Sequence, residues 1–252
     1  MLITAVQERT EAELTAGTEL PNSVSIGLDL GTLAGIQPAG AIVGSDPESL
    51  FIAVDCVIDF TIPDATLSHA RLAQETGTSL VIGTTGLDEV HMTALKEAGG
   101  SAAVVYSGNM SLGVNILLGL VEQAARSLSS DYDIEVLEMH HKHKIDAPSG
   151  TALMLGRAAA KGREISSEGS SVMSRVGETG PRPSGAIGYA TLRGGDVIGE
   201  HSVILAGAGE RIELTHKAND RALFAKGAVH AALWTQGQAP GLYTMGHVLG
   251  LN

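Results

Sequence analysis

The sequence has little cysteine and few positive charges, and it contains no long hydrophobic run. Cys56 is the single cysteine, so an internal disulfide and a cysteine-based metal cluster are excluded, and a reducing cytoplasmic setting is expected. Sixteen Lys and Arg against 28 Asp and Glu give a net charge of −12, which argues against nucleic acid or an anionic membrane as partner. Nowhere do about 18 apolar residues follow one another, so neither a membrane span nor a signal peptide is predicted.

Aromatic residues are also scarce, at 3% of the chain, although 44% of the residues are hydrophobic. The core must therefore consist mainly of aliphatic side chains, as in layered folds of helices and strands, and the composition excludes a disordered protein. Glycine is abundant, with 32 of 252 residues, and it stands at the ends of apolar runs rather than in low-complexity tracts. This distribution indicates tight turns.

The first half of the chain alternates short β-branched runs with longer helical patterns. We expect buried strands over residues 56–61, 79–85 and 102–108, each followed by a helix that begins near Pro63, Leu87 or Ser111. This alternation predicts a parallel sheet that binds its ligand at the carboxyl ends of the strands.

Beyond residue 131 the pattern changes to one helix followed by several strands in succession. Residues 133–141 read as a strand, residues 146–160 as a loop that opens a helix, and residues 185–193, 197–206 and 211–218 as further strands. We therefore predict two domains with a cleft between them. Residues 1–110, with the tail 236–252 returning to them, form an α/β domain, and residues 111–235 form an α+β domain with a mixed sheet.

The strongest chemical signal lies in residues 138–151. Three histidines and two lysines stand together from His140 to Lys144 in an otherwise acidic chain. Lysine supplies fixed positive charge, and histidine exchanges protons near neutral pH. Ser149 or Asp146 then caps a helix whose free backbone amides bind carboxylate or phosphate. The segment predicts an anion site with acid–base capability.

Two other interpretations of the same segment are open. It can be a solvated basic surface, or His140, His141 and His143 can bind zinc, although the two neighbouring lysines would repel the metal ion. If the strand continued through the cluster, His141 and His143 would face away from His140, Lys142 and Lys144. We favour the anion site.

The segment EMHHKHKIDAPSGTA closely resembles the signature of the 4-hydroxy-tetrahydrodipicolinate reductase family. The resemblance extends through DFT (59–61), IGTTG (82–86), SGNMSLGVN (107–115), LRGGDVIGEH (192–201) and ERIELTHKAND (210–220). It implies a Rossmann-like cofactor domain and a substrate and oligomerisation domain. The implied reaction, in lysine and diaminopimelate biosynthesis, reduces a cyclic dicarboxylate with NADH or NADPH, and hydride reaches the ring carbon that loses its hydroxyl group as water.

The resemblance also implies roles for individual residues. His140 is the expected proton donor or acceptor, and Lys144 is the expected second acid, which also attracts a substrate carboxylate. His141, Gly150, Thr151 and Arg221 match substrate-binding positions. The expected cofactor-binding residues are Glu19, Phe60, Gly83, Thr84, Thr85, Ser107, Gly108, Asn109 and Met110. No metal is expected, and the family resemblance implies a homotetramer formed through the second domain.

The sequence departs from the family pattern at two points. The family's first strand and glycine-rich pyrophosphate loop do not precede Glu19, so we expect the natural start to lie upstream of Met1. The alternative is a non-catalytic dicarboxylate-binding or assembly subunit. The second departure is Leu20, which follows Glu19 where an arginine would pair with the 2′-phosphate of NADPH. We therefore expect a preference for NADH.

Overall fold

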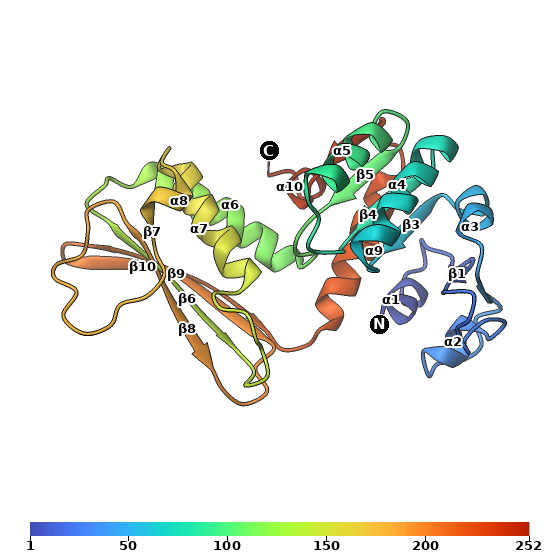
Figure 1. The fold of residues 1–252 in the computed structure, drawn as a ribbon, viewed down its shortest axis with the longest axis horizontal. Helices are drawn as coiled ribbons and strands as arrows, with labels where there is room; N and C mark the ends of the chain where they lie inside the picture. Colours follow the sequence, from blue (N-terminus) through green and yellow to red (C-terminus); the bar gives the residue numbers. More distant parts are fainter. Residues whose placement is uncertain (252) are drawn as a thin grey trace. The chain divides into compact units, whose positions relative to one another are not determined.

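The computed structural model describes residues 1–251, which divide into two compact units (Figure 1). The first unit comprises Met1–Ser111 and Ala222–Gly250, and the second comprises Leu112–Arg221. The division at residue 111 lies within one residue of the boundary expected from the sequence. The helix over residues 222–235, which was expected in the second domain, instead belongs to the first unit.

A four-stranded parallel sheet forms the centre of the first unit. Its strand order is β11-β5-β4-β3, where β3 is Cys56–Asp59, β4 Ser79–Ile82, β5 Ala103–Tyr106 and β11 Gly241–Tyr243. Leu80, Val81 and Ile82 of β4 are fully buried, as expected for a strand covered on both faces. Because all strands run parallel, their carboxyl ends lie along one edge of the sheet, where the expected cofactor loops begin.

Proline, glycine and capping residues mark the ends of the helices in this unit. Helix α4 (Pro63–Thr76) has proline at its first turn and ends at Gly77, whose φ of 76° is the left-handed conformation that glycine adopts without strain. Helix α5 (Glu89–Ala98) begins with a capping box between Asp88 and His91. Helix α3 spans Pro47–Ala53, α1 spans Leu2–Gln7 and the short helix α10 spans Met245–Val248.

Helix α9 (Ala222–Thr235) packs against α1 and against strands β3 and β4. Ala225 and Val229 form a buried cluster with Ala5 of α1. A side chain at Gly227 would collide with the backbone carbonyl of Met110, so glycine permits the close approach. The helix is apolar around most of its surface and needs cover on several sides, which explains why it joins the first unit despite following the strands of the second.

The remaining strands of the first unit form a separate ladder. Strand β1 (Gly17–Thr18) pairs in parallel with β2 (Val43–Gly44), next to the short helix α2 (Leu30–Leu33). Strand β3 ends the four-stranded sheet, and within residues 1–251 no strand pairs with its outer edge. Among the described residues, the β1–β2 ladder and the four-stranded sheet are therefore two separate sheets.

The second unit contains a five-stranded mixed sheet with the order β10-β9-β6-β8-β7. Strand β6 runs parallel to β8 and antiparallel to β9, which is antiparallel to β10. The strands are β6 Asp133–His140, β7 Ser171–Val172, β8 Ile187–Arg193, β9 Gly199–Gly207 and β10 Glu210–Ala218. Every second residue of β6 is buried, so one face of the sheet covers the core and the other is open.

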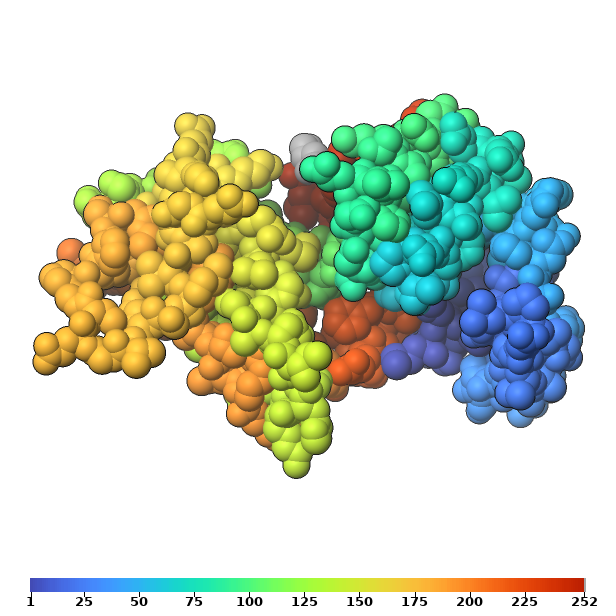
Figure 2. Space-filling view, viewed as in Figure 1, coloured from blue at the N-terminus to red at the C-terminus, as the bar shows by residue number. Residues whose placement is uncertain are grey.

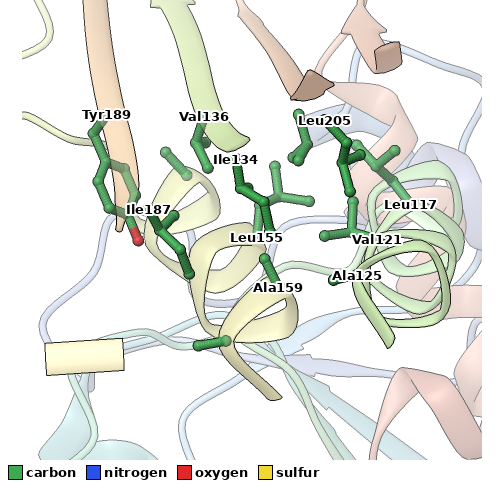
Figure 3. Packing of buried hydrophobic residues seen from close by; sticks show 13 residues of the cluster. Leu117, Val121, Ala125, Ile134, Val136, Leu155, Ala159, Ile187, Tyr189 and Leu205 are labelled. Carbon is green, nitrogen blue, oxygen red and sulfur yellow. The ribbon is translucent and has the colours of Figure 1, made fainter. Parts of the chain in front are cut away.

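Helices α6 (Leu112–Ser127) and α7 (Gly150–Gly162) cover the core face of this sheet (Figure 3). Between them and the strands lies an aliphatic core that includes Val121, Val136 and Leu155. Two glycines bring α7 very close to its neighbours. A methyl group at Gly156 would collide with the Tyr189 hydroxyl of β8, and one at Gly162 would collide with a backbone carbonyl of α6.

A short helix, α8 (Ser167–Ser170), precedes β7, and the long loop after β7 is tied back to β6. Arg175 forms a two-pronged ion pair with Glu135, at 2.7 and 2.9 Å, and Arg182 binds both Glu135 and Asp133 at 3.1 Å. Among residues 1–251, the helices are all too short or too polar to cross a membrane.

Candidate active site

The histidine and lysine cluster lies where β6 leaves the sheet. His140 is the last residue of β6, and the chain then turns alongside the loop that joins β8 to β9. The His141 amide donates to the Val197 carbonyl at 2.7 Å, and the Gly194 amide donates to the His140 carbonyl at 3.0 Å. Side chains therefore alternate between the two faces of the sheet only as far as His140, because residues 141–144 form a turn rather than a strand.

The buried carboxylate of Glu138 organises this end of the strand. Its side chain is fully inaccessible and receives a two-pronged ion pair from Arg193 of β8, at 2.8 and 2.9 Å. The His140 Nδ1 atom lies 2.5 Å from Glu138 Oε2, and the Ser149 amide donates to Oε1 at 3.1 Å. Burial acts to raise the pKa of Glu138, but the hydrogen bonds from Arg193 and His140 outweigh it and hold the pKa below its usual range.

Ser149 connects the strand to the start of α7. Its hydroxyl group accepts from the Ala152 amide at 3.2 Å and so caps the helix, as predicted. The same hydroxyl lies 3.0 Å from Nε2 of His201 on β9. Gly150, the first residue of the helix, is exposed, and no protein atom lies within 4 Å of the position that a side chain would occupy. The helix start is therefore open to a ligand.

The two buried histidines of the site differ in environment. His140 and His201 pack edge to face, with ring centroids 5.0 Å apart. Burial lowers the pKa of His201 to about 4, so its imidazole is neutral at physiological pH. Burial also lowers the pKa of His140, but Glu138 opposes this effect by stabilising the charged ring. His140 thus differs from His201 in its direct hydrogen bond with a carboxylate.

The turn after β6 presents its charges at the surface of the second unit, where Figure 2 shows it in yellow-green. Lys144 forms an ion pair with Asp146 at 2.8 Å, and its side chain is 21% exposed. An exposed pair of this kind is weak and exchanges readily with other anions. Lys144 is therefore available to a carboxylate ligand.

His141 of this turn lies close to Arg221, with 3.4 Å between His141 Nε2 and the guanidinium group. They line an open pocket of about 610 Å³ together with Lys142, His143, Gly195, Asp196 and Ile198. His140 does not line this pocket, because its ring points to the core face of the sheet. The rings of His141 and His143 lie 6.3 Å apart, and among residues 1–251 no group of three acidic, histidine or cysteine side chains could hold a metal ion.

The expected cofactor loops lie in the first unit, at the carboxyl ends of β3, β4 and β5. The Phe60 ring after β3 covers Gly83 after β4 so closely that any side chain at Gly83 would collide with it. Thr84 is buried, whereas Thr85 is exposed. Phe60 is itself 39% exposed, so an apolar ring is partly open to solvent at this edge.

The buried carboxylate of Asp59 joins these two loops. It accepts hydrogen bonds from the Thr61 hydroxyl at 2.6 Å, the Thr66 hydroxyl at 2.8 Å and the Thr84 hydroxyl at 3.2 Å. His69 Nδ1 lies 3.0 Å from its second oxygen. The carboxylate therefore holds the β3–α4 and β4–α5 loops in a fixed arrangement.

The loop after β5 contains the remaining expected cofactor residues. The Ser107 hydroxyl donates to the Asn109 carbonyl at 2.7 Å, Gly108 is exposed and Met110 is buried. Glu19 follows β1 and is exposed, with its carboxylate accepting from the Leu20 amide at 3.1 Å. Exposed amides, hydroxyl groups and an aromatic ring at the carboxyl ends of parallel strands fit a nicotinamide dinucleotide.

Three polar residues that organise the site of the second unit were not singled out from the sequence. Glu138, Arg193 and His201 occur inside the motifs quoted above, but nothing in a single sequence shows that they meet. Their convergence depends on the pairing of β6 with both β8 and β9, where Glu138 is opposite His201 and His140 is opposite Arg193. A charged residue at a buried position of an alternating strand is the one signal that marks Glu138 in advance.

A Rossmann-like parallel sheet in one unit and a mixed sheet with a buried histidine in the other are the features of a nicotinamide-dependent oxidoreductase. Both halves of the chain match one family. Residues 1–110 match the family description "Dihydrodipicolinate reductase, N-terminus", and residues 113–249 match "Dihydrodipicolinate reductase, C-terminus". The chain belongs to the dihydrodipicolinate reductase family.

Individual relatives agree with this assignment. The chain is 56% identical to the 4-hydroxy-tetrahydrodipicolinate reductase of Afipia carboxidovorans, over 99% of this chain and 92% of that protein. It is 55% identical to the enzyme of the same name from Sinorhizobium fredii, over 100% of this chain and 93% of that protein. Among solved structures, a dipicolinate-bound dihydrodipicolinate reductase from Paenisporosarcina has the same fold, with a TM-score of 0.75 at 23% identity, over 96% of this chain and 91% of that one.

Proposed function

We propose that this protein reduces 4-hydroxy-tetrahydrodipicolinate to tetrahydrodipicolinate in lysine and diaminopimelate biosynthesis. The identity of more than 50% to reductases of that name, over nearly the whole chain, supports the assignment. The observation that carries the chemistry is the arrangement around His140. A buried imidazole with a charged partner lies next to a lysine and the open start of a helix.

The nicotinamide dinucleotide, when bound, supplies the hydride for the reduction. The residues of the second unit handle the protons and the substrate charges. His140 gives or takes a proton at its ring nitrogen that does not face Glu138. Lys144 acts as the second acid and, by leaving Asp146, attracts a carboxylate of the substrate.

The two carboxylates of the substrate require several cationic or amide donors. We assign one carboxylate to Lys144 and to the backbone amides of Gly150 and Thr151 at the start of α7, where the helix dipole favours negative charge. His141 and Arg221 border the neighbouring pocket and supply further positive charge. The name of the Paenisporosarcina protein records dipicolinate, a ring with two carboxylates, as its bound ligand.

Glu19 supports a preference for NADH over NADPH. An exposed carboxylate after β1 accepts hydrogen bonds from the ribose hydroxyl groups and repels the 2′-phosphate. The next residue is Leu20, which offers no positive charge to a phosphate. We expect Glu19→Ala to bring the two dissociation constants together, as measured by cofactor fluorescence. Tenfold tighter binding of NADPH by the unchanged protein would contradict the preference.

The function is tested by following the oxidation of NADH with 4-hydroxy-tetrahydrodipicolinate as substrate. His140→Ala should lower kcat by about 100-fold or more, the usual contribution of a positioned acid or base. Lys144→Ala should lower kcat and raise KM for the dicarboxylate. Lys161→Ala is the matched control, since Lys161 also forms an ion pair, 2.9 Å from Glu122, but lies at the far end of α7.

Unchanged rates in both His140→Ala and Lys144→Ala would remove the assigned roles. The non-catalytic alternative, a subunit that binds the dicarboxylate without using a cofactor, is separated by titration. Binding of pyridine-2,6-dicarboxylate without any binding of NADH would favour that alternative, whereas binding of both favours the reductase.

We also propose that the protein acts as a cytoplasmic homotetramer. The sheet of the second unit supports this, because its face opposite α6 and α7 carries Leu137, Met139 and Ile204 half-buried and Leu192 47% exposed. Copies of the chain that pack through this face would cover these side chains. Sedimentation equilibrium should give four times the mass of one chain, and a monomer at micromolar concentration would refute the assembly.

A further inference from the structure

Glu138 has no role in the proposed reaction as described above, yet it is among the most elaborately bound side chains of the second unit. It is fully buried and lies on β6 two residues before His140. Its two oxygens receive Arg193 from β8, Ser149 from the start of α7 and His140 from its own strand. A buried carboxylate with this many donors stays ionised, and an ionised carboxylate only accepts hydrogen bonds.

That property determines which nitrogen of His140 carries the proton. His140 Nδ1 lies 2.5 Å from Glu138 Oε2, a hydrogen-bond distance at which Nδ1 must be the donor. In the neutral ring the proton therefore resides on Nδ1, and Nε2 is left with its lone pair. Nε2 faces the backbone of Gly199, where an added methyl group would come within 3.1 Å of it. The absence of a side chain at Gly199 keeps that side of Nε2 open.

We propose that Glu138 is the positioning residue of the active site, which fixes the tautomer and orientation of His140 so that Nε2 is its proton-exchanging atom. Arg193 contributes to this positioning, because its two-pronged ion pair fixes both oxygens of Glu138. The proposal rests on the proposed function, in which His140 moves the proton.

The charges that face His140 determine the expected effect on its titration. Glu138 on the same strand stabilises the charged ring, whereas Lys144 from the following turn and Arg193 from β8 destabilise it. His201 from β9 faces the ring and is neutral. Replacing Glu138 by glutamine removes the one stabilising charge, so the pKa of His140 should fall further below its ordinary value.

The experiment combines kinetics with nitrogen NMR on the full-length protein. Glu138→Gln should lower kcat by about 10- to 100-fold, a part of the general acid–base contribution, and leave KM for the dicarboxylate nearly unchanged. The matched control is Glu135→Gln. Glu135 lies on the same strand, faces the other side of the sheet and also loses a two-pronged arginine pair on substitution. It should retain wild-type kcat.

The NMR measurement tests the tautomer without any turnover. In ¹⁵N-histidine-labelled protein, the His140 resonances are identified by their loss in His140→Ala, and neutral His140 should carry its proton on Nδ1. In Glu138→Gln this preference should disappear and the titration midpoint of His140 should move to lower pH, while Glu135→Gln matches the wild type.

Two results would overturn the proposal. One is a wild-type His140 protonated on Nε2, a measurement that does not depend on whether Glu138→Gln folds. The other is an equal loss of kcat in Glu138→Gln and Glu135→Gln. The proposed function is tested separately: it is wrong if the wild-type protein does not turn over the dicarboxylate. In that case the tautomer measurement still tests the role of Glu138.

Discussion

Removal of the Asp59 carboxylate should destabilise the first unit. Asp59→Ala leaves the Thr66 and Thr84 hydroxyl groups, which are 0% and 4% exposed, without the acceptor that they now share. A buried polar group without its partner costs about 1–3 kcal/mol, so the two together should cost about 2–6 kcal/mol. Thr61 and His69 are nearer to solvent and can bind water instead. The loss is large against the roughly 5–15 kcal/mol of a typical domain.

Trp234 provides a direct measurement of this loss. It is the single tryptophan of the chain and lies in α9, in the same unit as Asp59. Urea unfolding followed by tryptophan fluorescence therefore reports on the unit that contains the change. Asp55→Ala is the control, because Asp55 immediately precedes the same strand but is exposed. A loss below about 0.5 kcal/mol, the range of ordinary surface substitutions, would refute the reasoning.

The same carboxylate predicts a dependence on pH. Burial acts to raise the pKa of Asp59, but the hydrogen bonds from His69, Thr61 and Thr66 outweigh it, so the pKa in the folded protein lies below its ordinary value. The unfolded chain keeps the ordinary value of about 3.9. The stabilisation is therefore complete above about pH 4 and is lost as the pH falls through the folded value. The difference in unfolding free energy between wild type and Asp59→Ala should shrink below about pH 4.

Three further outcomes are expected. Gly150→Ala should leave the unfolding midpoint unchanged, because no other part of the protein lies near the added methyl group. It should raise KM for the dicarboxylate, and an unchanged KM would show that no ligand approaches this backbone. Gly162→Ala should lower the unfolding midpoint of the second unit, because the added methyl group collides with α6. Circular dichroism measures the midpoint, and a wild-type melting curve would contradict the close packing. Burial raises the pKa of the half-buried Cys56 thiol to about 12, so a disulfide reagent at pH 8 should react much more slowly with the folded protein than with the denatured chain. Equal rates in the two states would contradict the raised pKa.

Local patterns in the sequence predicted most elements of the fold. Short apolar runs predicted the strands β3, β4 and β5, Pro63 marked the start of α4, and Ser149 marked the start of α7. The mixed sheet of the second unit followed from strands in succession. These features depend on neighbours in sequence, which a single chain displays directly.

The features that the sequence did not reveal depend on residues far apart in the chain. The sequence predicted a strand that includes His141, but the loop at residues 194–197 accepts hydrogen bonds from the amides of His141 and Lys142, and the strand ends at His140. Helix α9 follows the second unit in sequence, and only its contact with α1 places it in the first. The convergence of Arg193 and His201 on Glu138 and His140 likewise requires the register of three strands.

The glycines of α7 have a consequence for ligand binding. Gly156 sits directly against Tyr189 of β8, and Gly162 sits directly against the backbone of α6, so α7 can neither slide nor roll without a steric clash. The amides at its first turn are therefore preorganised, and an incoming carboxylate meets donors that need no rearrangement. At a rise of about 1.5 Å per residue, these two buried glycines lie about 10–20 Å along the helix from its first turn. By fixing the helix they reduce the entropy that is lost when an anion binds at that turn.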